Sequence, residues 1–263
     1  MKALDDLCLL GSGMISDPWF QNVGSNLLTI LIIAAVGWGI HRITRRARLL
    51  RFFGLKQERR LVLYLSNVRV VTGGAIGIDE KPRSYSGTAI PDNEVGLIPV
   101  FQRLFNFIIP GVTEQPGFLK WLLISDVQVQ AMPSPVDVDE VEKTSTFIAV
   151  GSQAYNGASL RIEQAFDPLA RLEDKGIKLR DVPDIEDTRC GFVQRVFDQD
   201  SGQSAFYVAG PSTLATTGAA YYLARRWLYL SRKYKTSKRF CVVLRFPSPD
   251  PRSFEVVFEK AGN

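Results

Sequence analysis

Histidine and cysteine are scarce in this 263-residue chain, which has one His and three Cys. The single imidazole, His41, excludes most zinc sites and most Ser-His or Cys-His catalysis. The three cysteines are an odd number and lie far apart, which argues against a disulfide framework and against a cysteine zinc site. We therefore expect neither a metal nor a cofactor.

The sequence also lacks the common nucleotide-binding signatures. It contains no GxxxxGK[ST] phosphate-binding loop and no GxGxxG dinucleotide fingerprint. ATP hydrolysis and dinucleotide redox chemistry are therefore unsupported. Acidic residues near the glycine-rich loop, Asp79 and Glu94, are the candidates for a general acid or base. Of these, Glu94 is the catalytic residue that we would expect if the protein is an enzyme.

The excess of basic over acidic charge comes from one short segment. The chain has a formal net charge of +5, and residues 41–60 hold eight Lys or Arg residues but only one acidic residue, Glu58. Residues 61–263 hold equal numbers of basic and acidic side chains, 23 of each. This distribution is not that of a basic domain that coats a nucleic-acid backbone.

An uncharged, largely apolar run occupies Val23–Ile40. Its 18 residues are close to the minimum for a helix that crosses a bilayer. A buried core helix and a signal-peptide hydrophobic region are the alternatives. Twenty-two residues, which include Asp5, Asp6 and Asp17, precede the run, and an arginine cluster follows it in place of a cleavage site. We expect a membrane anchor.

The arginine cluster predicts the orientation of this anchor. Positive residues stay on the cytoplasmic side of a membrane, where they meet anionic lipid. We therefore expect a protein of the bacterial inner membrane with residues 1–22 outside, a transmembrane helix at 23–40, a basic juxtamembrane segment at 41–60 and a cytosolic domain at 61–263. Ser25, Asn26 and Thr29 give the helix a partly polar face, and Ala35 and Gly39 have a spacing that lets two such helices pack closely.

Apolar segments that favour strands alternate with helical segments through most of residues 61–246. Leu61–Val71 has strand composition with a bend at Ser66-Asn67, and Thr146–Val150 is a short apolar strand. The apolar strands are short and continuous, as in a sheet that is covered on both faces. Phe240–Phe246 and Phe254–Phe258 are expected to form a hairpin. This pattern predicts one α/β domain with a mixed sheet. We also expect a helix over Glu94–Ile109 and a long glycine-rich loop over Thr72–Gly87.

Two junctions share one pattern: a short apolar strand, then glycine, then small polar residues, then a helix. They are AVGSQAYNGAS at Ala149–Ser159 and VAGPSTLATTG at Val208–Gly218. Ligands of open α/β sheets collect beyond the carboxyl ends of strands, where glycine allows close approach and a helix start favours an anion. Plain helix capping explains the same residues. The expected ligand-binding residues, including those of the loop after Leu65, are Ser66, Asn67, Gly73, Gly74, Arg83, Tyr85, Gly151, Ser152, Asn156, Gly210, Ser212 and Thr213.

Surface charge of opposite sign gathers in two further places. The helix that starts at Thr213 ends in a basic cluster around Arg225, Arg226 and Arg232, and Asp181–Asp187 is acidic. The acidic stretch is a candidate partner for a second subunit, although most such runs are only solvated. Glu163 and Asp167 are expected on one helix, facing solvent.

The arrangement of one membrane helix, a basic juxtamembrane segment and an α/β domain with the turns AVGSQAYN and VAGPSTLATTGAA resembles the membrane effectors of bacterial antiphage defence. The resemblance implies a Rossmann-like sensor domain that binds a nucleotide or short oligonucleotide. It also implies control of an oligomeric pore or of membrane disruption, with a nucleotide-synthesising enzyme as a genetic partner. The alternatives are a membrane-tethered enzyme that cleaves or transfers a nucleoside glycosyl bond, and a structural tether for a partner protein.

Overall fold

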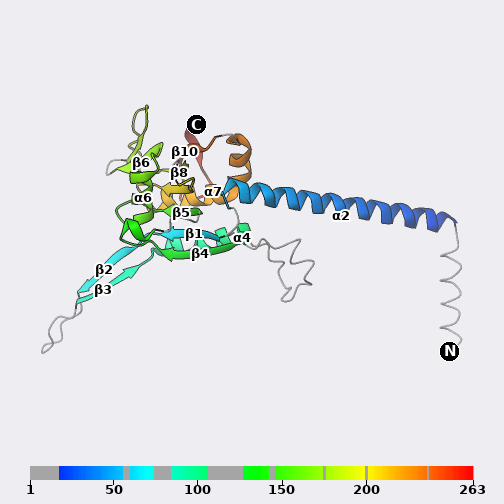
Figure 1. Cartoon of the computed structure of the whole chain (residues 1–263), viewed down its shortest axis with the longest axis horizontal. Helices are drawn as coiled ribbons and strands as arrows, with labels where there is room; N and C mark the ends of the chain where they lie inside the picture. The colour runs from blue at the N-terminus through cyan, green and yellow to red at the C-terminus, as the bar shows by residue number, and fades with distance from the viewer. Residues whose placement is uncertain are drawn as a thin grey trace. The chain divides into compact units, whose positions relative to one another are not determined.

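The computed structural model describes residues 18–55, 60–73, 84–105, 127–141, 146–173, 176–198, 201–235 and 237–262. The chain divides into two compact units, Met1–Ala47 and Arg48–Asn263. The larger unit holds the sheet and the helices that cover it (Figure 1).

Helix α2 (Pro18–Phe52) contains the apolar run. Its stretch Asn26–Phe52 is long and apolar enough to cross a membrane, and none of the apolar window is buried. Side chains such as Ile30 and Ile33 are 62% and 66% exposed. The alternative of a buried core helix is therefore wrong for the apolar window of this stretch.

A seven-stranded mixed sheet forms the centre of the larger unit, with the strand order β11-β10-β8-β9-β5-β1-β4 (Figure 1). The parallel half consists of β4 (Gln128–Pro133), β1 (Arg60–Leu65), β5 (Thr146–Val150) and β9 (Ser204–Ala209). The antiparallel half consists of β8 (Cys190–Phe197), β10 (Arg239–Arg245) and β11 (Glu255–Gly262). The predicted α/β class with a mixed sheet is confirmed.

Two hydrophobic clusters cover the two faces of this sheet. One face packs against α4 (Ile98–Phe105), α7 (Thr213–Lys233) and the last turn of α2. The other packs against α6 (Gly157–Ala165) and the hairpin of β6 (Ala170–Glu173) and β7 (Gly176–Leu179). Neighbouring residues of β1, Leu61 and Val62, belong to different clusters. A strand with both faces covered needs apolar side chains throughout, which is why β1 and β5 read as continuous apolar runs.

The end of α2 is part of the first cluster. Leu49, Phe52 and Phe53 are at most 6% exposed, and Phe53 is fully buried. The ring of Phe53 lies 5.0 Å from that of Phe206 in β9 and 5.1 Å from that of Phe105 in α4. The apolar helix therefore continues without a break into residues that the domain needs for its core.

Several local expectations differ from the structure. As far as Phe105, the single helix expected over Glu94–Ile109 is two helices, α3 (Asp92–Val95) and α4, with Gly96 between them; residues 106–109 lie outside the described part of the chain. Part of the expected loop over Thr72–Gly87 is strand, because β3 (Ser84–Ala89) pairs with β2 (Val68–Gly73) in a separate two-stranded sheet. A short 3-10 helix, η1, spans Val138–Glu140.

Candidate functional site

The parallel strands β1, β5 and β9 lie next to one another, so their carboxyl ends meet at one end of the sheet. The residues that follow them are Ser66, Gly151 and Gly210. The amide of Gly151 donates to the carbonyl oxygen of Val208 at 2.9 Å, which ties the two junctions together. This is the end of an open α/β sheet where ligands bind.

A buried carboxylate, that of Glu94 in α3, lies at this position. Glu94 is 5% exposed, and Ser66, at 4%, donates to it twice. The amide of Ser66 donates to Oε2 at 2.7 Å and its hydroxyl donates to Oε1 at 2.8 Å. Burial raises the pKa of Glu94, and the two hydrogen bonds from Ser66 oppose that shift. Two residues predicted separately, one for catalysis and one for binding, are thus in direct contact.

Gly151 is packed against the same pair. Its φ of +102° is a backbone conformation that side-chain-bearing residues rarely adopt. A Cβ atom at this position would lie 2.2 Å from Oγ of Ser66 and 3.4 Å from Oε1 of Glu94. Glycine is therefore required for the strand end to approach the buried carboxylate.

The junction at α6 is built from internal hydrogen bonds. Oδ1 of Asn156 accepts from the amides of Ala158 and Ser159 at 3.0 and 3.2 Å, which caps the helix. Its Nδ2 donates to the carbonyl oxygens of Val150 (2.7 Å) and Tyr64 (3.1 Å). Asn156 is only 1% exposed. Plain capping therefore accounts for Asn156, one of the expected ligand-binding residues.

The junction at α7 is more open. Ser212 is the N-cap: its hydroxyl accepts from the amide of Ala215 at 3.3 Å and donates to the carbonyl oxygen of Thr188 at 2.8 Å. Thr213, the first helical residue, is exposed. The hydroxyl of Thr217, one turn further, accepts from Nδ2 of Asn93 at 3.0 Å. Asn93 adjoins Glu94 in α3, so this bond connects the start of α7 to the helix that carries the buried carboxylate.

We call these converging residues the strand-end site; it consists of Ser66, Asn93, Glu94, Gly151, Gly210 and Thr217. Asn93 and Thr217 were missed by the sequence analysis. Asn93 belongs to no motif, and only the packing of α3 against α7 brings it together with Thr217. Their one sequence signal was position: Asn93 precedes Glu94, and Thr217 lies in the motif VAGPSTLATTG.

The other predicted site residues lie around the strand-end site or outside the described part of the chain. Asn67 donates through Nδ2 to the carbonyl oxygen of Ser134 at 3.1 Å, beside β4. Ser152 follows Gly151 and is half-buried, and Gly73 ends β2. The backbone of Tyr85 is in β3. Gly74, Arg83 and also Asp79 lie outside the described residues.

Gly218 belongs to the core and not to a ligand site. A Cβ atom at this residue would lie 2.4 Å from the Phe246 ring. The small residue thus allows α7 to pack closely on the sheet. A large substitution at Gly218 would disturb this packing and would not report on a ligand.

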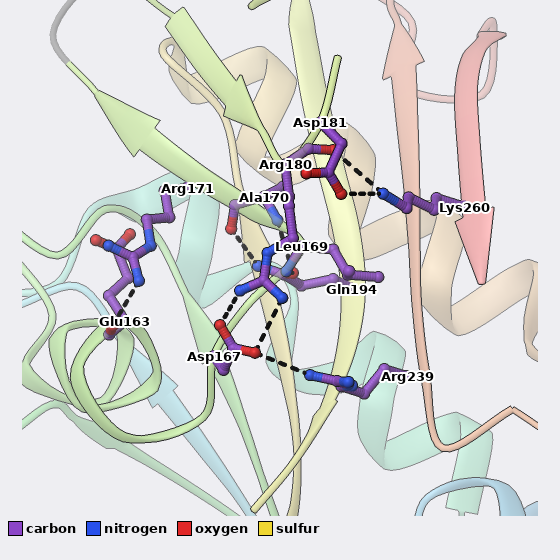
Figure 2. A network of polar contacts seen from close by, with 10 residues as sticks. All are labelled: Glu163, Asp167, Leu169, Ala170, Arg171, Arg180, Asp181, Gln194, Arg239 and Lys260. Atoms are coloured by element: carbon purple, nitrogen blue, oxygen red, sulfur yellow. Dashed lines mark hydrogen bonds and ion pairs between the residues drawn. The ribbon is translucent and has the colours of Figure 1, made fainter. Parts of the chain in front are cut away.

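A second polar network lies on the face of the sheet that α6 covers (Figure 2). Asp167, at φ +51°, pairs with both Arg180 and Arg239. It follows the end of α6, so the expectation that it lies on a helix with Glu163 is wrong. Glu163 is half-buried and not solvent-facing, because it accepts from the hydroxyl of the buried Tyr207 at 2.9 Å.

Gln194 holds the same network to the sheet. It is fully buried in β8. Its Oε1 accepts from the amides of Leu169 and Ala170 at 3.0 and 3.1 Å, and its Nε2 donates to the carbonyl oxygen of Ala170 at 2.6 Å (Figure 2). These bonds fix the start of the β6–β7 hairpin, and this network therefore has a structural role.

Among the residues that the structure describes, no group of three or more His, Cys, Asp or Glu side chains is placed to hold a metal ion. The fold defines an α/β protein with a large mixed sheet and an N-terminal helix that is apolar enough to cross a membrane. Comparison of the chain with family models, curated proteins and solved structures finds no match.

Proposed function

We propose that this protein is a membrane-anchored effector whose α/β domain senses a nucleotide or short oligonucleotide. The observation that carries the proposal is the convergence of three strand ends and the start of α7 around the buried carboxylate of Glu94. The ligand binds at the strand-end site, and its binding controls an oligomeric pore or the disruption of the membrane. Antiphage defence is the setting that the resemblance of the sequence suggests.

The strand-end site contains two kinds of recognition chemistry. A carboxylate such as Glu94 accepts hydrogen bonds from ribose hydroxyls or from base amino groups. The start of α7, at Ser212 and Thr213, favours an anion through its backbone amides and its helix dipole. A nucleotide carries both kinds of group, a sugar and base at one end and phosphate at the other. Asn93 and Thr217 lie between the two positions and offer further polar contacts.

The membrane part of the proposal rests on α2. The positive-inside rule places the arginine cluster and the α/β domain in the cytoplasm of a bacterium, with the N-terminus outside. The core packing of Phe52 and Phe53 supports coupling, because a change in the domain core also changes the environment of the last turn of α2. One helix cannot enclose a channel, so this function requires several copies of the chain. A nucleotide-synthesising enzyme is the expected genetic partner.

Nucleotide binding by the full-length protein in detergent micelles tests the proposal. A panel of mononucleotides, dinucleotides and short oligonucleotides is titrated and binding is measured by calorimetry. Glu94→Gln keeps the side-chain shape but removes the charge, and it should lower the affinity for the nucleotide tenfold or more. Glu140→Gln, at an exposed carboxylate in η1, is the matched control and should leave the affinity unchanged. Absence of binding by the whole panel, or equal affinities of all three proteins, would contradict the proposal.

A second function is favoured by the environment of Glu94. Because burial raises its pKa, Glu94 is suited to hold a proton closer to neutral pH than an exposed carboxyl group. A membrane-tethered enzyme that cleaves or transfers a nucleoside glycosyl bond would use it as the general acid. Incubation of the full-length protein with NAD and nucleosides should then release free base, and Glu94→Gln should abolish the release. Binding without any turnover would reject this enzyme and leave the sensor.

A further inference from the structure

A groove of about 570 Å³ lies on the face of the sheet that α6 covers. Its volume is within the range of small-molecule and side-chain binding sites. The β6–β7 hairpin and the loop that follows it supply most of its wall. The lining residues are Gln153, Glu173, Gly176, Ile177, Lys178, Asp184 and Glu186.

The groove carries an excess of negative charge. Glu173 and Lys178 pair with one another at 3.1 Å. Asp184 and Glu186 are exposed and form no ion pair within the described part of the chain. Gln153 donates through Nε2 to the carbonyl oxygen of Leu172 at 2.6 Å, but its buried Oε1 accepts no hydrogen bond. The side-chain donors of the lining, Nζ of Lys178 and Nε2 of Gln153, are already engaged with Glu173 and Leu172, so the remaining acceptors suit a guanidinium group with its five N–H donors.

The chain carries such donors on the exposed side of α7. Arg225, Arg226 and Arg232 are exposed and, among the described residues, none of them forms a direct ion pair, although the charge of Arg225 contributes to the lowered pKa of Asp250. The guanidinium carbons of the first two lie 5.9 Å from the ring centre of Tyr221 and 5.6 Å from that of Phe254. Aromatic contacts thus hold two exposed side chains on this side of α7.

The acidic groove and this basic side of α7 belong to opposite faces of one sheet. The groove's hairpin packs through Leu172 and Ile177 into one cluster, and α7 packs through Ala219 and Leu223 into the other. A single chain therefore cannot bring the two surfaces together. A second copy of the chain can, and the two different surfaces then form a head-to-tail contact.

We propose that the groove receives the arginines of α7 from a second copy of the same chain. Repetition of this head-to-tail contact closes a ring when the rotation between copies allows it. The contact concerns the assembly that the proposed function requires. Its test needs no nucleotide, so failure of assembly is distinguished from failure of nucleotide binding.

Charge reversal tests this contact in the full-length protein in detergent micelles. The groove variant combines Asp184→Lys and Glu186→Lys, and the helix variant combines Arg225→Glu and Arg226→Glu. Mass is followed by light scattering over a range of protein concentrations. In each variant, the protein concentration at which half of the chains are assembled should rise at least tenfold. A mixture of the two variants should restore assembly, because each reversed surface then meets its complement. High salt should weaken the wild-type assembly.

Two further variants keep the test falsifiable. Glu140→Lys combined with Glu255→Lys makes the same change of charge at exposed residues outside the groove and should assemble like the wild type. Asp184→Asn combined with Glu186→Gln keeps the shape of the groove and should weaken assembly less than the groove variant does. The proposal is overturned if the wild type is monomeric at all concentrations. It is also overturned if the charge-reversed variants assemble like the wild type, or if their mixture stays dissociated while both variants melt at the wild-type temperature.

Discussion

Replacing Gly151 by alanine should destabilise the domain through one identifiable contact, the approach of the new Cβ to Oγ of Ser66. The two atoms would lie 2.2 Å apart, so the hydroxyl must move away from Glu94. Alanine at φ +102° adds backbone strain of about 1–3 kcal/mol. Loss of the Ser66 hydrogen bond to a buried carboxylate adds about 1–3 kcal/mol. We therefore expect a loss of about 4 kcal/mol in the free energy of unfolding.

A double-mutant cycle separates these two contributions. Ser66→Ala alone should cost about 1–3 kcal/mol, because it removes the hydroxyl that donates to Glu94. The Cβ of Ser66 lies 3.6 Å from the new atom, which is ordinary van der Waals contact. Both single variants lose the hydrogen bond from the Ser66 hydroxyl to Glu94, but the double variant loses it only once and has no hydroxyl for the new Cβ to clash with. Its cost should therefore be smaller than the sum of the single costs by about 1–3 kcal/mol.

Thermal melts of the full-length protein in detergent, followed by circular dichroism, measure the cycle. One kcal/mol corresponds to about 2–4 °C in a domain of this size. Gly202→Ala is the control, because Gly202 also has a positive φ but its Cβ would meet nothing within 4 Å. It should cost about 1 kcal/mol. Additivity of the Gly151 and Ser66 effects within about 0.5 kcal/mol would refute the contact.

Three other changes have defined outcomes. Phe53→Ala should cost about 3–5 kcal/mol in melts, because the ring is fully buried, whereas Leu31→Ala on the exposed part of α2 should leave the domain unchanged. Asn156→Ala should cost about 2 kcal/mol or more in urea titrations, because it removes a cap and two further hydrogen bonds. Hydrogen bonds from Arg189 lower the pKa of Asp187 from 3.8 to about 2. The free energy of unfolding should therefore fall by about 1 kcal/mol between pH 4 and 2. Asp187→Asn should remove this pH-dependent loss.

The sign of the pH effect follows from the direction of the shift. Because the folded-state pKa of Asp187 is depressed, its contribution is present above the unfolded value and is lost as pH falls through the folded one. A wild-type curve and an Asp187→Asn curve with the same slope over this range would contradict the assignment. Equal melting temperatures of wild type and Phe53→Ala would show that the end of α2 is not part of the core.

The sheet was predictable where its strands are buried on both faces. Such strands read as continuous apolar runs, and β1, β5 and β10 were located on that basis. The hairpin of β10 and β11 followed from two apolar segments separated by a proline-containing turn. The β6–β7 hairpin was not found, because each strand has only four residues and only β6 alternates between buried and exposed positions. The break at Gly96 was missed because a single glycine inside an apolar pattern does not specify a helix end.

The candidate site was predictable in composition but not in arrangement. Glycine followed by Ser, Thr or Asn at a strand end marks the two junctions, and the pattern does not distinguish a cap from a ligand contact. The structure assigns Asn156 to capping, since all its polar groups have partners in the backbone. Glu94 was singled out only as an acidic residue near a glycine-rich loop. Its burial depends on α3 packing over the end of β1, and no local pattern specifies this packing.

The local amino-acid sequence and its composition by themselves predicted an apolar helix followed by an arginine cluster, and an α/β fold for the rest of the chain. These properties depend on residues close together in the chain, where helix and strand periods and the solvation of charge act directly. The tertiary structure alone decided which distant residues meet: Ser66 with Glu94, and Asn93 with Thr217. Such contacts depend on the order of strands in the sheet, and that order is set by how the whole core packs.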